Sequence, residues 1–186
     1  MKDFINFIKK YISISSETEN AIIQIAKYQE YKKGTILLEQ GKTCRKLYFL
    51  VSGTVRTYFY QNDKDVTHWI YINDSIFTSF NSYILQKPSV EFLETTEDSN
   101  IVSITYSEWQ FLYKKYPELE RFGRLIMEEQ MAAIDEFYKG YYFLSAKEKY
   151  NLLIESYPEI LQKANLGHIA SMLGISQETL SRIRGK

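Results

Sequence analysis

The chain has 186 residues, and 45% of them are hydrophobic, which is enough for one large domain or for a medium domain with a small one. Its 23 basic and 23 acidic side chains balance, which excludes a global electrostatic field that would draw the whole protein to nucleic acid or to a membrane. The single cysteine, Cys44, excludes an internal disulfide and any cysteine-based zinc or iron–sulfur centre.

No apolar run approaches the roughly 20 residues that a membrane-spanning helix needs. The first residues, MKDFINFIKKY, have neither the apolar stretch nor the small-residue cleavage site of a signal peptide. We therefore expect a cytoplasmic protein with no membrane contact, no metal and no cofactor. We expect Cys44 to be a free thiol in a strand-rich segment.

The first 30 or so residues are predicted to be helical. Ser16 and Glu19 have the spacing of a capping box, which opens a helix that carries Ile22 and Ile25. A helix before it has an apolar stripe made of Phe4, Ile5, Phe7 and Ile8.

Between Tyr31 and Thr105 the pattern changes to short segments rich in β-branched and aromatic residues. Turn signals such as Lys33-Gly34 and Asn62-Asp63 separate them. Several short strands at this spacing predict an antiparallel barrel or jelly roll. The expected strands cover 35–38, 46–51, 54–60, 66–71, 92–95 and 100–104.

Helices return after Ser107, with a short one over 107–115 and a long one from Pro117 to about Tyr142. The long helix has two apolar stripes. The first can pack on the protein's own strands, and a twin helix across a two-fold axis would cover the second. We therefore predict a homodimer, although both stripes could also be buried within one chain. The first stripe is Leu119, Phe122, Ile126, Ala133 and Phe137, and the second is Met127, Met131, Ile134, Tyr138 and Tyr141.

Ser145 and Glu148 form another capping box, which begins a helix that runs to about Ser156. The most specific pattern follows in NLGHIASMLGISQETLSRIRGK, residues 165–186. Gly174 suits the left-handed cap that ends a helix, and Ser176 can cap the next helix. Two short helices joined by a tight glycine turn predict a helix-turn-helix. Its inner residues are expected to be Leu166, Ile169, Ala170, Leu173, Leu180 and Ile183.

The outward face of the second helix has side chains suited to reading DNA bases. Arg182 can make paired hydrogen bonds to guanine, Gln177 to adenine, and Glu178 can accept one from cytosine. Phosphates could be contacted by Lys163, Arg184, Lys186 and the Ser176 hydroxyl. The predicted DNA-binding residues are Ser176, Gln177, Glu178, Ser181, Arg182, Arg184 and Lys186.

Nearly the whole chain resembles the Crp/Fnr family, the cyclic-AMP-receptor-like transcription regulators. The resemblance rests on KKGTILLEQGKTCRKLYFLVSGTVRTY, with Gly41 and Gly53, and on ISQETLSRI near the end. The resemblance implies an α+β fold in three parts. Residues 1–115 would form an effector-sensing, cyclic-nucleotide-binding-like antiparallel β-roll with N-terminal helices. Residues 116–144 would form a dimerisation helix, and residues 145–186 a helix-turn-helix DNA-binding domain. The resemblance also implies double-stranded DNA and RNA polymerase as partners.

Two departures from the family qualify this resemblance. Cyclic-nucleotide binders in the family carry a Gly-Glu-Leu stretch and an Arg-Ser or Arg-Thr pair, whereas this chain has Phe77-Thr78-Ser79 and Pro88-Ser89. A buried phosphate without its arginine would cost on the order of several kcal/mol, which argues against cyclic AMP. The chain also has little or no wing after the second helix, so non-specific DNA affinity should be weaker.

The aromatic surroundings of the roll favour an uncharged or apolar effector. Equally, the aromatic cluster could be plain core, with no small-molecule ligand in the roll. The candidate effector pocket comprises Tyr71, Phe77, Thr78, Ser79, Phe80, Tyr83, Pro88 and Ser89.

The sequence also bears on two other classes of protein. A catalytic cupin-type roll needs clustered histidines, but His68 and His168 fall in different segments, and no phosphate loop or catalytic triad is visible, so we expect no enzyme activity. His168 is expected to face solvent. The stronger alternative is a ligand-sensing or protein-interaction module whose helix-turn-helix does not bind DNA, which the neutral overall charge and the missing wing favour.

Overall fold

The structure, a computed structural model, describes residues 1–185 and leaves out the side chains at 140 and 141. The predicted site residues Lys186 and Tyr141 therefore lie outside what is described. The helices are α1 (Lys2–Tyr11), α2 (Ser16–Ile25), α3 (Phe80–Leu85), α4 (Tyr106–Lys115), α5 (Pro117–Phe143), α6 (Ala146–Ser156), α7 (Ile160–Lys163), α8 (Leu166–Met172) and α9 (Gln177–Arg184). The strands are β1 (Lys27–Tyr31), β2 (Ile36–Leu38), β3 (Lys46–Ser52), β4 (Val55–Gln61), β5 (Lys64–Tyr71), β6 (Ser75–Phe77), β7 (Phe92–Thr95) and β8 (Ser99–Thr105).

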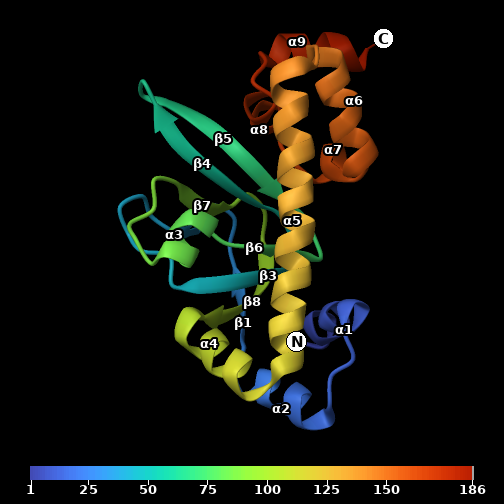
Figure 1. Ribbon diagram of the computed structural model, residues 1–186. Helices are drawn as coiled ribbons and strands as arrows, with labels where there is room; N and C mark the ends of the chain where they lie inside the picture. Colours follow the sequence, from blue (N-terminus) through green and yellow to red (C-terminus); the bar gives the residue numbers. More distant parts are fainter. Residues whose placement is uncertain (186) are drawn as a thin grey trace.

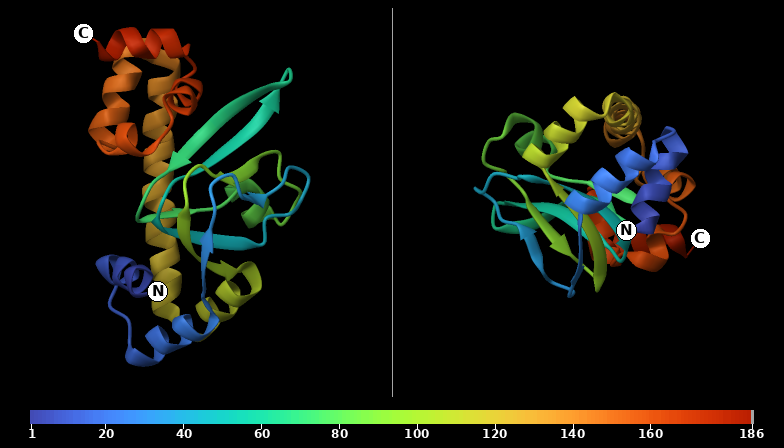
Figure 2. Two further views of the ribbon diagram at one scale, coloured as in Figure 1. Left: turned by 180° about the vertical axis from the view of Figure 1, so that it is seen from behind. Right: turned by 90° about the horizontal axis from the view of Figure 1, so that it is seen from below.

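The strands form two four-stranded antiparallel sheets, in the orders β1-β8-β3-β6 and β2-β7-β4-β5. This arrangement confirms the predicted antiparallel roll. Helix α5 runs along the roll and continues to the C-terminal helices, and the β4–β5 hairpin extends beside α8 (Figures 1 and 2). Within residues 1–185, no helix is both long enough and apolar enough to cross a membrane.

The roll interior is a packed aromatic and aliphatic core. The Tyr48 and Phe77 rings stack with centroids 5.0 Å apart, and Tyr71 lies 5.4 Å from Phe77. Gly53, between β3 and β4, has φ +101°, and a Cβ there would lie 2.7 Å from the Cα of Ser99. Only glycine fits this turn, because both the backbone angle and the space exclude a side chain.

A second core joins the roll to the helices at its base. Phe4, Phe7 and Ile8 of α1 are buried there, as their spacing predicted, against Phe49 of β3. Leu119, Phe122 and Ile126 of α5 are buried in the same cluster. Each such side chain contributes about 1.5–3 kcal/mol on burial, so this core holds α5 against the roll.

Three local predictions need correction. Residues 27–31 form strand β1 rather than the end of a helix, because Lys27–Tyr31 pairs with the edge of β8. The cap of α2 is Ser15 rather than Ser16, since the Ser15 side chain accepts a hydrogen bond from the Thr18 N–H. Strand β6, which pairs with β3, was not predicted.

Candidate nucleic-acid interface

Helix α8 begins and ends with hydrogen bonds that its own sequence supplies. The Asn165 side chain accepts a hydrogen bond of 2.7 Å from the Gly167 N–H at its start. At its end, the N–H groups of Gly174 and Ile175 donate to the carbonyls of Ser171 and Ala170, both at 3.0 Å. Gly174 has φ +67°, which confirms the predicted left-handed cap. The chain therefore turns sharply into α9.

Side chains from both helices close the inside of this turn. Ile169 and Ala170 of α8 and Leu173, the residue that caps its C-terminal end, are buried against Leu180 of α9. Ala170 is small where α9 must pass close by. This inner face is the predicted one, apart from Leu166 and Ile183, which are half-buried. The two helices thus form the compact pair that a helix-turn-helix requires.

The outer face of α9 is polar and exposed. Gln177, Glu178, Ser181, Arg182 and Arg184 all face solvent. The guanidinium of Arg182 also donates to the Thr179 hydroxyl, at 3.3 Å. The face can therefore offer hydrogen-bonding groups to another molecule.

Local hydrogen bonds at the start of α9 organise this face. The Ser176 hydroxyl caps the helix by accepting from the Thr179 N–H at 3.2 Å. Hydrogen bonds from its own N–H and from Ser176 hold the pKa of Glu178 below its usual range. Glu178 is therefore an ionised hydrogen-bond acceptor at neutral pH. It lies in the first turn of α9, at the N-terminal end of the helix, where the helix dipole favours negative charge.

Helix α5 carries an exposed apolar stripe beyond the part that packs on the roll. Met127, Met131, Ile134 and Tyr138 expose 41%, 73%, 60% and 61% of their surface. Contiguous exposed apolar patches are typical of interaction surfaces. Its role in dimerisation stays a prediction.

The predicted effector pocket does not form one cavity lining. Tyr71, Phe77 and Tyr83 belong to the packed interior of the roll, and Pro88 is exposed. Phe80 lines two grooves between the roll and α5, one together with Tyr83 and the other together with Tyr71.

The serine and threonine members of that set are buried and bonded within the chain. The Ser79 and Ser89 hydroxyls share a hydrogen bond of 3.0 Å, and the Thr78 hydroxyl donates to the Lys46 carbonyl at 2.9 Å. Side chains thus fill the interior of the roll, and an effector there stays a prediction.

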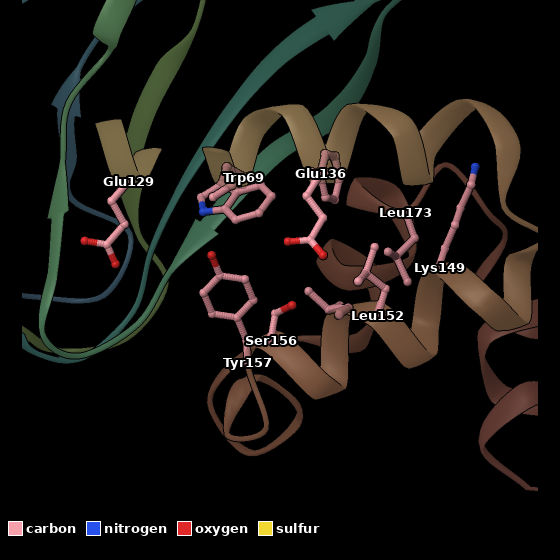
Figure 3. Close-up of a pocket in the computed structure, with 11 residues that line it drawn as sticks. Trp69, Glu129, Glu136, Lys149, Leu152, Ser156, Tyr157 and Leu173 are labelled. Carbon is pink, nitrogen blue, oxygen red and sulfur yellow. The ribbon is translucent and has the colours of Figure 1, made fainter. Parts of the chain in front are cut away.

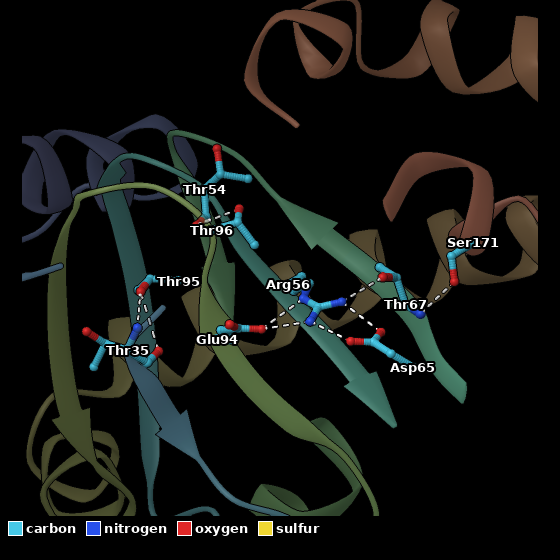
Figure 4. A network of polar contacts seen from close by, with 9 residues as sticks. All are labelled: Thr35, Thr54, Arg56, Asp65, Thr67, Glu94, Thr95, Thr96 and Ser171. Atoms are coloured by element: carbon cyan, nitrogen blue, oxygen red, sulfur yellow. Dashed lines mark hydrogen bonds and ion pairs between the residues drawn. The ribbon is translucent and has the colours of Figure 1, made fainter. Parts of the chain in front are cut away.

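A polar network connects the roll to the helix-turn-helix, and the sequence reasoning missed it (Figure 4). The buried guanidinium of Arg56 pairs with both oxygens of Asp65, at 2.8 and 2.7 Å, and with Glu94, at 3.0 and 2.8 Å. Next to it, the Thr67 N–H donates to the Ser171 hydroxyl of α8 at 2.9 Å. The available signal was an arginine near the start of a strand that is otherwise rich in β-branched and aromatic residues.

The two histidines lie on different elements, as predicted. His68 of β5 bonds Glu91 at 3.0 Å, and His168 of α8 is half-buried rather than fully solvent-facing. The Glu91 hydrogen bond raises the pKa of His68, while burial, followed by the charge of Arg56, lowers the pKa of His168. We expect their titration midpoints to fall on opposite sides of about 6.5.

The two shifts affect stability with opposite signs. For His168, the unfolded chain binds the proton more tightly, so stability is lost as the pH falls from about 6.5 through the folded pKa. For His68, the added stability is present below about 6.5 and is lost as the pH rises through its higher folded pKa. An NMR titration of the imidazole signals, assigned with His168→Gln, checks this. A shared midpoint would contradict it.

Comparisons with known proteins support one fold. Residues 28–116 match the family model for the cyclic nucleotide-binding domain. The c-di-GMP responsive global regulator CLP of Xanthomonas campestris has a TM-score of 0.67 and 14% identity, over 92% of this chain and 90% of that one. FixK2 of Bradyrhizobium japonicum has a TM-score of 0.72 and 14% identity, over 87% and 83%. No curated protein sequence matches the chain.

A third structure carries the family name in its own description. It is a transcriptional regulator of the Crp/Fnr family from Eubacterium rectale, with a TM-score of 0.68 and 18% identity, over 94% of this chain and 85% of that one. The descriptions of the Xanthomonas campestris and Eubacterium rectale proteins both name them as regulators. The comparisons confirm the resemblance to the Crp/Fnr regulators and the fold that it implies.

Proposed function

We propose that this chain, which has the fold of the Crp/Fnr regulators and a cyclic nucleotide-binding domain at residues 28–116, is a DNA-binding transcription regulator that acts as a homodimer. The observation that carries the proposal is the exposed polar face of α9, held out from a capped helix-turn-helix. A surface with arginine, glutamine and glutamate on one short helix suits the major groove.

We assign one proposed role to each of three successive parts of the chain. Residues 1–115 sense a signal other than cyclic AMP, 116–144 dimerise and 145–186 bind DNA. Two recognition helices in a dimer must lie roughly 34 Å apart to enter successive major grooves on one face of the duplex. A signal that shifts α5 would change that separation, provided it favours one arrangement over the other. RNA polymerase is a further proposed partner.

Within α9, each side chain has a proposed role. Arg182 reads guanine, Gln177 reads adenine and Glu178 reads cytosine. Ser176, Arg184 and Lys186 contact phosphates, together with Lys163 just before α8. Ser181 is a further proposed DNA-binding residue. Glu178 supports this assignment, because an ionised carboxylate is the form that accepts a hydrogen bond from the cytosine amino group.

The test is selection of binding sites from a random pool of duplexes, followed by titration of the selected site. We expect Arg182→Ala to weaken binding about 10- to 100-fold and to relax the preference at one base pair. Arg121→Ala removes the same charge from an exposed position at the start of α5 and serves as the matched control. Equal effects of both substitutions, or no selected site, would contradict the proposal and favour a protein-interaction module.

A further inference from the structure

A cavity of about 280 Å³ lies where the roll, α5 and the C-terminal helices meet (Figure 3). Three aromatic residues line it from three different elements, namely Trp69 of β5, Phe137 of α5 and Tyr157 just after α6. Trp69 lies 4.9 Å from Phe137 and 5.7 Å from Tyr157 between ring centroids, edge to face in both pairs. The cavity is separate from the packed interior of the roll.

The cavity also has acidic groups. Glu129 and Glu136 of α5 line it, and in Figure 3 the Glu136 carboxylate points into the cavity that Trp69 and Tyr157 also line. The charges of both carboxylates act on the Tyr157 hydroxyl. The Tyr11 hydroxyl donates to Glu129 at 2.7 Å, which fixes that carboxylate. Lys149 lines the opposite end, and its ammonium group points away from Glu136. Aromatic rings and carboxylates therefore share one end of the cavity.

The negative potential of the two carboxylates reaches the aromatic wall. Burial, and then the charges of Glu129 and Glu136, raise the pKa of Tyr157. Its hydroxyl therefore stays protonated at neutral pH. A positive charge in the same place would be favoured by the potential that keeps the phenol neutral.

We propose that this cavity binds a small organic cation, an amine or quaternary ammonium group with an apolar body. A cation is attracted to the faces of tryptophan and tyrosine, and more strongly where carboxylates add to the attraction. The aliphatic walls, among them Leu152 and Leu153 of α6, would bury the apolar part. The volume limits the ligand to a small molecule.

The proposed dimer leaves this cavity accessible. At 100° per residue, Glu136 lies about 140° around α5 from Met131, so the acidic face and the exposed apolar stripe point in different directions. Most of the cavity lining comes instead from α5 and α6. Leu173, at the C-terminal end of α8, also lines it, so a ligand would contact the helix-turn-helix directly.

The experiment is calorimetric titration of the full chain with three probes of similar size. These are benzyltrimethylammonium, neutral benzyl alcohol and anionic phenylacetate. We expect the cation to bind at least about fivefold more tightly than the alcohol, and phenylacetate to bind weakest. Cation binding should weaken as salt is raised. Binding of the cation no tighter than the alcohol would overturn the proposal.

Substitutions at exposed positions then locate the site without endangering the fold. Glu136→Gln should raise the Kd of benzyltrimethylammonium about two- to fivefold, and Glu129→Gln/Glu136→Gln should raise it further. Glu128→Gln is the matched control, because it is an exposed glutamate of α5 outside the cavity. Equal Kd values for Glu136→Gln and Glu128→Gln would overturn the placement of the ligand.

A second measurement concerns regulation, and only this part depends on the proposed function. If the cation acts as an effector, benzyltrimethylammonium should change the affinity for the selected duplex, and Glu136→Gln should reduce that change. If the cation binds but no duplex is selected, the proposed cation site stands and the proposed regulator function is contradicted. If a duplex is bound but the cation is not, the proposed cation site is contradicted and the proposed regulator function stands.

Discussion

Replacing Arg56 with methionine is expected to lower the free energy of unfolding by about 3 kcal/mol. The guanidinium side chain exposes only 8% of its surface and holds Asp65 and Glu94 on either side. Methionine would fill much of the space but leave two carboxylates close together without their counter-ion. The Arg56 guanidinium also lies 4.0 Å from the Tyr58 ring, and that contact would be lost as well.

Chemical denaturation followed by circular dichroism measures this effect. Arg45→Met is the matched control, since Arg45 is an exposed arginine of the same roll. We expect the control to change the midpoint little, because surface substitutions are usually within about 0.5 kcal/mol. Adding Asp65→Asn to Arg56→Met should restore part of the loss by removing one unpaired charge. Indistinguishable midpoints for Arg56→Met and Arg45→Met would contradict a stabilising role for the network.

Met131→Glu is expected to prevent dimerisation and to weaken binding of the selected duplex at least about 100-fold. Met131 is the most exposed residue of the described apolar stripe on α5, at 73%. In a symmetric dimer the substitution would bring two new carboxylates together in an apolar seam. A monomer would bind one half-site only and would lose the gain from linking two recognition helices.

Analytical ultracentrifugation gives the oligomeric state, and titration of the duplex gives the affinity. Ala132→Glu introduces the same charge at the next position, which is exposed and points away from the stripe. We expect this control to stay dimeric and to bind normally. Dimers that persist with Met131→Glu would mean that another surface holds the two copies together.

The helix-turn-helix was predictable because its determinants are local. Gly174 takes the left-handed conformation, Ser176 caps the next helix and Leu180 fills the inside of the turn. Each of these features depends on residues within one or two turns of chain. The Ser145–Glu148 capping box was predictable for the same reason.

The features that the sequence reasoning missed depend on contacts between distant residues. Strand β1 is largely polar and becomes a strand only through pairing with β8, some 70 positions later. The pairing of Arg56 with Glu94 needs the register of β4 against β7. The cavity brings together Trp69, Glu136 and Tyr157, which no local pattern connects. Periodicity identifies a face to be buried but does not identify its partner.

The contact between Thr67 and Ser171 has a consequence for the solubility of the roll. Strand β5 is the outer strand of its sheet, and its outward N–H groups would be open to pairing with a strand of another molecule. Helix α8 covers this edge, and Ser171 occupies the Thr67 donor. The helix-turn-helix segment therefore also shields the roll from self-association, and a roll separated from it would expose a strand edge that is free to pair.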